Sequence, residues 1–167
     1  AKEFSLSAMA RREKEICRAV LSPRREVVLA GAYGCGNRGD ELMLENLLRD
    51  VRAAAPECAV TLLSRRPKET ARRFDADSLY YLNVPALSRR MKCARALVLG
   101  GGNLLQDATS RRSLAYYLAL LQKGKRSGCR TLLYGAGLGP LSPGGWAKCT
   151  AALNDCADTI VFRERES

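Results

Sequence analysis

Short apolar runs alternate with longer amphipathic stretches along most of this chain. The apolar runs are rich in Val, Leu and Ala, which is typical of strands that are buried within a parallel sheet. The stretches between them carry apolar residues three and four positions apart, as on one face of a helix. The pattern predicts strands at residues 27–30, 59–63, 79–82, 96–99, 131–134 and 159–162, and helices at 42–51, 68–74, 87–93, 112–126 and 146–156.

This alternation indicates the α/β class, with right-handed βαβ units that build a Rossmann-like parallel sheet flanked by helices. We expect residues 26–167 to form that domain. Residues 1–25 read as a charged N-terminal extension, with an amphipathic helix over 8–22 that Pro23 ends. Glu164 and Glu166 follow the last predicted strand and are typical of the start of another helix. We therefore expect 26–167 to be the first domain of a longer, two-domain protein.

Composition narrows the function classes. The 167 residues are 47% hydrophobic and 27% charged, as in one globular domain. No apolar run approaches the roughly 20 residues that cross a bilayer, and the N-terminus lacks the apolar stretch of a secretion signal. The chain has no histidine, which excludes an imidazole base, nucleophile or metal ligand. Its seven cysteines include no CxxC pair, so we expect a reduced, cytoplasmic protein without a metal site.

The net charge of +11 divides into +4 over residues 1–25 and +7 over residues 26–167. A basic surface favours anionic partners such as nucleic acid, phosphorylated metabolites or an anionic membrane face. An ordinary solvated basic surface accounts for the charge equally well. Charge alone therefore does not select the partner.

Glycine-rich loops follow three of the predicted strands, at residues 31–41, 100–107 and 135–140. Because the carboxyl ends of parallel strands meet at one edge of a sheet, these loops are expected to lie together around a crevice. Glycine removes side-chain bulk, so backbone N–H groups can approach an anion closely. Three such loops on one edge predict a ligand-binding site there.

The first loop contains Gly34-Cys-Gly36-Asn-Arg-Gly39, which satisfies the GxGxxG pattern of dinucleotide-binding folds. The acidic residue that would hold the ribose is absent, and Arg65 follows the second strand instead. Arg65 suits a 2′-phosphate, so NADP remains an alternative ligand. Asp40 is either a functional carboxylate or the cap of the helix that follows.

The second loop offers several hydrogen-bonding side chains beside three successive glycines. Asn103, Gln106 and Asp107 follow Gly102, and Ser110 and two arginines precede the next helix. Arginine binds carboxylate and phosphate through two hydrogen bonds, so these residues are candidates for anion binding. In the alternative interpretation, Ser110 caps the helix and the arginines are solvated. Tyr116 and Tyr117 lie in a mostly apolar helix, and we expect them to pack in the core.

Four stretches occur in the order of a known family: GAYGCGNRGDELML at 31–44, LGGGNLLQDATSRRSLAYYLALL at 99–121, LYGAGLGPL at 133–141 and DTIVFRERES at 158–167. They resemble the polysaccharide pyruvyl transferase family, especially its bacterial cell-wall branch, whose members place a pyruvate ketal on cell-wall and capsular sugars. Arg165 stands where the family usually has Glu. The resemblance covers about residues 26–167.

The resemblance implies a two-domain architecture similar to GT-B glycosyltransferases, with the active site in the cleft between the domains. It implies phosphoenolpyruvate as co-substrate, no further cofactor, and a glycan or lipid-linked glycan as acceptor. Arg163 is then expected to bind the phosphate or carboxylate of the donor. The acceptor side of the cleft is expected to involve Asn37, Gly39, Asp40, Gly101, Gly102, Asn103, Gln106, Asp107, Ser110 and Arg111.

The catalytic histidine and lysine of the family would come from a missing C-terminal half, so we expect this chain alone to be inactive. A peripheral association with the inner membrane face fits a lipid-linked acceptor and the basic charge. The alternative function is a nucleotide-binding module for NADP or a sugar nucleotide. A nucleic-acid partner is not expected, because no recognised nucleic-acid module occurs and the glycine loops would be left unexplained.

Overall fold

Six strands form a single sheet in the order β3-β2-β1-β4-β5-β6, and every neighbouring pair is parallel. The computed structural model describes residues 24–162. Its strands are β1 (Glu26–Ala30), β2 (Ala59–Ser64), β3 (Asp77–Tyr80), β4 (Ala94–Gly100), β5 (Arg130–Ala136) and β6 (Thr159–Phe162). Its helices are α2 (Arg38–Ala54), α3 (Pro67–Phe74), α4 (Val84–Cys93), α5 (Arg111–Arg126) and α6 (Pro143–Cys156). The predicted Rossmann-like α/β fold is confirmed.

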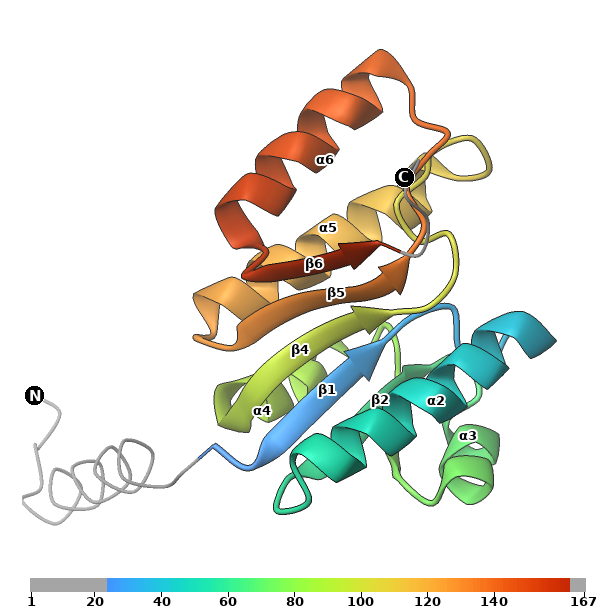
Figure 1. Ribbon diagram of the computed structural model, residues 1–167, viewed down its shortest axis with the longest axis vertical. Helices are drawn as coiled ribbons and strands as arrows, with labels where there is room; N and C mark the ends of the chain where they lie inside the picture. Colours follow the sequence, from blue (N-terminus) through green and yellow to red (C-terminus); the bar gives the residue numbers. More distant parts are fainter. Residues whose placement is uncertain (1–23, 163–167) are drawn as a thin grey trace, which may run out of the picture.

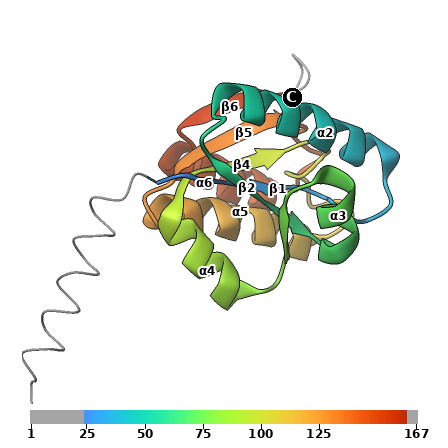
Figure 2. The same ribbon diagram turned by 90° about the horizontal axis from the view of Figure 1, so that it is seen from below.

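Helices cover both faces of this sheet (Figure 1). One core cluster joins α2 and α3 to residues such as Leu29, Leu62 and Val98 on one sheet face. A larger cluster joins α4, α5 and α6 to residues such as Leu97 and Leu133 on the other face. Figure 2 shows α2 on one side of the strands, with α4 and α5 on the other. The central strand β1 is buried along its whole length, which explains its continuous apolar run.

Side-chain caps fix the first residues of α4 and α6, and both helices begin earlier than the sequence pattern predicted. Asn83 accepts a hydrogen bond from the Ala86 N–H at 3.2 Å, so α4 begins at Val84 rather than residue 87. Ser142 accepts one from the Gly145 N–H at 3.1 Å, and α6 begins at Pro143 rather than residue 146.

The strand predicted at 79–82 lies two residues earlier, at Asp77–Tyr80. A hydrogen bond of 2.8 Å from the Asn83 N–H to the Tyr80 carbonyl closes a turn and ends the strand there. The helix expected over 8–22 and the expected donor ligand Arg163 both lie outside the described residues. None of the described helices is both long enough and apolar enough to span a membrane.

Candidate functional site

The strands β1 and β4 lie side by side and parallel at the centre of the sheet. From β1 the chain adds β2 and β3 toward one edge of the sheet, and from β4 it adds β5 and β6 toward the other edge. The helix after β1 covers one face, and the helix after β4 covers the other. The connections leaving these two strands therefore diverge and leave a crevice at their carboxyl ends, where ligands bind in doubly wound folds. The first and second glycine loops meet at this crevice.

The first loop is fixed to both neighbouring strands. Tyr33 is fully buried, and its hydroxyl donates a hydrogen bond to the Gly100 carbonyl at the end of β4, at 2.7 Å. Its own carbonyl accepts a bond from the Arg65 N–H at 3.1 Å, just after β2. Gly31 passes so close to β4 that an added Cβ would lie 2.5 Å from the Gly100 oxygen. The loop is thus a rigid wall of the crevice.

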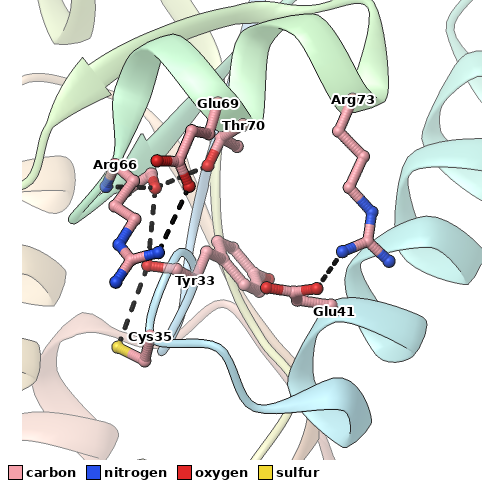
Figure 3. Close-up of polar contacts among 8 residues, drawn as sticks. Tyr33, Cys35, Glu41, Arg66, Glu69, Thr70 and Arg73 are labelled. Atoms are coloured by element: carbon pink, nitrogen blue, oxygen red, sulfur yellow. Dashed lines mark hydrogen bonds and ion pairs between the residues drawn. The ribbon is translucent and has the colours of Figure 1, made fainter.

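Polar side chains around the same loop join the end of β2 and the start of α2 to α3 (Figure 3). Ser64 at the end of β2 contacts the Thr70 hydroxyl at 2.7 Å and accepts a bond from the Arg66 N–H at 3.0 Å. Arg73 on α3 forms an ion pair with Glu41 on α2. Arg66 pairs with Glu69 at 3.4 Å. These two arginines are already neutralised by carboxylates, so this side of the loop offers little charge to a ligand.

The predicted residues Asn37, Gly39 and Asp40 do come together, at the start of α2. Asn37 is the helix cap: it accepts a bond from the Gly39 N–H at 3.0 Å and donates one to Asp40 at 2.9 Å. The alternative in which Asp40 is the cap is therefore wrong. Asp40 instead points toward the second loop, where an added Cβ on Gly102 would lie 2.6 Å from its Oδ1.

Backbone hydrogen bonds join the second and third glycine loops into one unit. The Gly137 N–H donates to the Gly102 carbonyl at 2.9 Å, and the Gly139 N–H donates to the Leu105 carbonyl at 2.8 Å. Asn103 adds a side-chain bond of 2.6 Å to the Gly139 carbonyl. Gly101 and Gly102 both have positive φ, at 77° and 70°, which lets the chain turn back toward the third loop.

The remaining predicted residues of the second loop make local contacts. Asp107 accepts hydrogen bonds from the N–H and the hydroxyl of Ser142, the cap of α6. The Gln106 side-chain amide donates a hydrogen bond to the Thr109 hydroxyl and accepts one from the Thr109 N–H. Ser110 caps α5 by accepting a hydrogen bond from the Ser113 N–H at 3.2 Å. Arg111 is exposed at the start of α5. Whether any of these side chains contacts an acceptor stays a prediction.

A cavity of about 630 Å³ opens at the carboxyl ends of the strands, on the face covered by α5. We call it the switch-point cavity. It is lined by Gly31, Ala32, Tyr33, Cys35, Leu63, Arg65, Tyr81, Leu82, Thr109, Ser110, Arg112, Ser113, Tyr116 and Tyr117. Its volume falls in the range of roughly 300–1,000 Å³ that is usual for small-molecule sites. Of the residues predicted to shape the acceptor side, only Ser110 lines it.

The sequence analysis missed the aromatic wall of this cavity. Tyr117 is buried, as expected for a core residue, and Tyr116 is half-buried, but both also line the cavity with Tyr81. Their rings stack edge to face, with centroids 5.4 Å apart for Tyr81–Tyr116 and 5.2 Å for Tyr116–Tyr117. The sequence signal for this wall was helical spacing. Arg112 and Ser113 lie one helical turn before Tyr116 and Tyr117, so each pair shares a face of the helix.

Burial controls the protonation of these tyrosines. It is the main cause that raises the pKa of Tyr117 to about 12, with smaller contributions from Cys35 and Asp40. Burial likewise raises the pKa of Tyr116. Both hydroxyls therefore stay protonated at neutral pH and serve as hydrogen-bonding groups rather than bases. Among residues 24–162, no group of three or more Cys, Asp or Glu side chains is arranged to hold a metal ion.

Comparison with protein-family models matches residues 37–167 to the family described as polysaccharide pyruvyl transferase. The chain belongs to this family. No curated protein and no solved structure gives a significant match. The region matched to the polysaccharide pyruvyl transferase family begins at the α2 cap and contains the second and third glycine loops. It also contains Arg163, whose position the described residues do not include.

Proposed function

We propose that this chain takes part in transferring a pyruvyl group from phosphoenolpyruvate to a sugar of a cell-wall or surface polysaccharide precursor. The observation that carries the proposal is family membership over residues 37–167. The switch-point cavity supports it, because two arginines and no carboxylate are found among its lining residues. This half of the active site thus suits anionic substrates.

The chemistry requires cations. Two sugar hydroxyls add to C2 of phosphoenolpyruvate, the methylene carbon takes up one proton, and phosphate leaves with the other. Donor and leaving group are both anionic, so positive groups stabilise the transition state. We propose that Arg163, which directly follows β6 in the sequence, binds the phosphate or carboxylate of the donor.

The acceptor side would be formed by the loops that meet at the crevice. We assign it to Asn37, Gly39, Asp40, Gly101, Gly102, Asn103, Gln106, Asp107, Ser110 and Arg111. Several of these side chains hold one loop against another, as Asp107 does with Ser142 and Asn103 with Gly139. Their contribution to acceptor binding is then to fix the shape of the crevice.

The chain offers no imidazole as a general acid for the methylene carbon. The chain has no histidine, and burial keeps the pKa of Tyr116 and of Tyr117 high. We propose that a C-terminal domain supplies the acid, that phosphoenolpyruvate is the only co-substrate, and that the isolated chain is inactive. We further propose that the enzyme works in the cytoplasm, in peripheral contact with the inner face of the membrane.

The test is a transfer assay on the chain alone and joined to a C-terminal half. Phosphate release and the mass of the sugar product report ketal formation. We expect activity only in the joined protein, and a loss of at least about tenfold in Arg163→Gln. Arg126→Gln, at the far end of α5, is the control and should keep full activity. Transfer by the isolated 167 residues would contradict the proposed division of the active site.

A nucleotide-binding module for NADP or a sugar nucleotide is the second candidate. Arg65 follows β2 and lines the switch-point cavity, and the strand order is that of dinucleotide-binding folds. The start of α2, where a dinucleotide would place its pyrophosphate, carries Asp40 and Glu41 in its first turn. These carboxylates disfavour an anion there. Titration with NADPH and with a uridine diphosphate sugar distinguishes this candidate from the transferase.

A further inference from the structure

The first turns of the two helices that begin at the crevice differ in charge. That of α2 contains Arg38 together with Asp40 and Glu41, whereas α5 begins with Arg111 and Arg112 and has no acidic residue in its first turn. Cations at a helix N-terminus oppose the helix dipole, so the arrangement in α5 disfavours the helix itself. Arg112 is exposed and forms no ion pair with another described residue. Helix stability therefore does not explain it.

A second guanidinium lines the same cavity. Arg65 leaves the end of β2 and lies over the ring of Tyr81, 5.4 Å from its centroid. Like Arg112, it has no carboxylate partner in residues 24–162. No Asp or Glu is present among the lining residues, where Arg65 and Arg112 supply two positive charges. A cavity lined by two guanidinium groups is suited to a phosphate group.

The aromatic wall points to the rest of the ligand. Tyr117 is only 7% exposed, and its hydroxyl makes no hydrogen bond with any other described residue. Every fully buried polar side-chain atom of the described residues has a hydrogen-bond partner. Because the Tyr117 hydroxyl has none, it is not fully buried and retains access to the cavity that Tyr117 lines. Ser113 and Thr109 add hydroxyls to the same wall. A hexose, with apolar C–H faces and a rim of hydroxyls, matches a surface of this composition.

We propose that the switch-point cavity binds a phosphorylated sugar. The phosphate lies between Arg65 and Arg112 at the start of α5, and the sugar ring lies along Tyr81, Tyr116 and Tyr117. The volume of about 630 Å³ is far more than an inorganic ion needs, since one water occupies roughly 30 Å³. This inference deepens the proposed function, on which it rests, by naming the acceptor as a sugar that carries a phosphate.

Calorimetric titration of the full 167-residue chain tests this assignment without phosphoenolpyruvate. N-acetylglucosamine 1-phosphate is the probe, with N-acetylglucosamine, inorganic phosphate, uridine diphosphate and NADPH as separate arms. We expect the sugar phosphate to bind more tightly than every other arm. Arg65→Gln and Arg112→Gln should each weaken it by about tenfold or more, since each removes a charged hydrogen bond. Arg126→Gln, on the same helix but at its other end, should bind as the unaltered chain does.

Tyr117→Phe separates the sugar from the phosphate. It should weaken binding of the sugar phosphate by about two- to tenfold, the effect of one neutral hydrogen bond, and leave inorganic phosphate binding unchanged. Circular dichroism of each variant confirms that the fold is kept. Failure of the sugar phosphate to bind, or equal binding by Arg112→Gln, overturns the proposal. If inorganic phosphate binds as tightly as the sugar phosphate, the cavity does not recognise the sugar and that part of the proposal is wrong. If uridine diphosphate or NADPH binds more tightly, the cavity is a nucleotide site.

The two proposals fail separately. The transfer assay depends on phosphoenolpyruvate and a second domain, whereas the titration depends on neither. If the sugar phosphate binds as expected but no ketal forms, the cavity assignment stands and the proposed function is wrong. If ketal forms but no sugar phosphate binds here, the acceptor is held elsewhere.

Discussion

Asp107 accepts two hydrogen bonds from Ser142, one of 2.8 Å from the backbone N–H and one from the hydroxyl. These bonds join the second glycine loop to the start of α6. They also lower the pKa of Asp107, with the Ser142 hydroxyl as the largest cause and its N–H as the next. Ser142 at the same time caps α6 through the Gly145 N–H. One carboxylate thus holds the second glycine loop against the start of α6.

We predict that Asp107 and Ser142 are energetically coupled. Asp107→Asn and Ser142→Ala should each lower the midpoint of thermal unfolding, and the double variant should lower it by less than the sum, because both remove the same contact. A double-mutant cycle in urea measures the coupling. Asp155→Asn, on the same helix and exposed, is the control and should leave the midpoint unchanged. Strict additivity would show that the contact does not contribute in solution.

Gly34 and Gly36 form a matched pair in the first loop, with φ values of 72° and 80°. A Cβ on Gly36 would meet nothing within 4 Å, whereas one on Gly34 would lie 2.3 Å from Ser64 Oγ and 2.9 Å from the Arg66 nitrogen. Gly36→Ala should therefore cost only backbone strain, about 1–2 kcal/mol. Gly34→Ala should cost about 1–3 kcal/mol more, because the loop must move away from β2. Equal unfolding free energies in urea would contradict this packing.

Tyr33→Phe tests the link between the first loop and β4. The variant removes the hydroxyl that donates to the Gly100 carbonyl at 2.7 Å inside the core, so the free energy of unfolding should fall by about 1 kcal/mol or more. Tyr134→Phe is the matched control, because the Tyr134 hydroxyl contacts Asp50 at the exposed surface. We expect that control to change the free energy of unfolding by no more than about 0.5 kcal/mol.

Asp158 makes a stabilising contribution that depends on pH. Hydrogen bonds lower the pKa of Asp158 to about 2. The bond with Lys125 is the largest cause, and the bond from the Thr131 N–H is the next. Because the folded-state pKa lies below the ordinary value of 3.8, the contribution is present above that value and is lost as pH falls toward about 2. Asp158→Asn should therefore flatten the decline of the unfolding midpoint between those two pH values. A variant that declines as steeply as the unaltered chain would contradict this.

Arg112 offers a test of binding against stability. Arg112→Glu places a negative charge at the positive end of the α5 dipole, so the free energy of unfolding should rise by about 0.3–1 kcal/mol. The same change should abolish binding of the sugar phosphate, because it reverses one of the two charges at the switch-point cavity. A variant that is less stable and still binds would show that Arg112 serves the fold instead. Measurements at low salt give the largest effect, since screening weakens the dipole interaction.

The hydrophobic pattern predicted the strands and helices of this protein. A strand that is covered on both faces needs a continuous apolar run, and a helix that packs on a sheet needs apolar residues three and four positions apart. The alternation of strands and helices predicted the parallel sheet, and its parallel direction placed all three glycine loops at one edge. The motifs at residues 31–44, 99–121, 133–141 and 158–167 predicted the family that the comparison with family models then found. These signals are local, so the sequence carries them directly.

Only the tertiary structure decided which side chains face the crevice. Asp107 and Asn103 follow the same glycines in sequence, yet Asp107 bonds to Ser142 at the start of α6 and Asn103 bonds to the Gly139 carbonyl in the third loop. Arg65, Tyr81 and Tyr116 come from separate elements, and no spacing along the chain relates them. They meet in one cavity because the strand order β3-β2-β1-β4 brings the ends of β2 and β3 to the face that α5 covers. Contacts between distant segments depend on that packing, which no local pattern records.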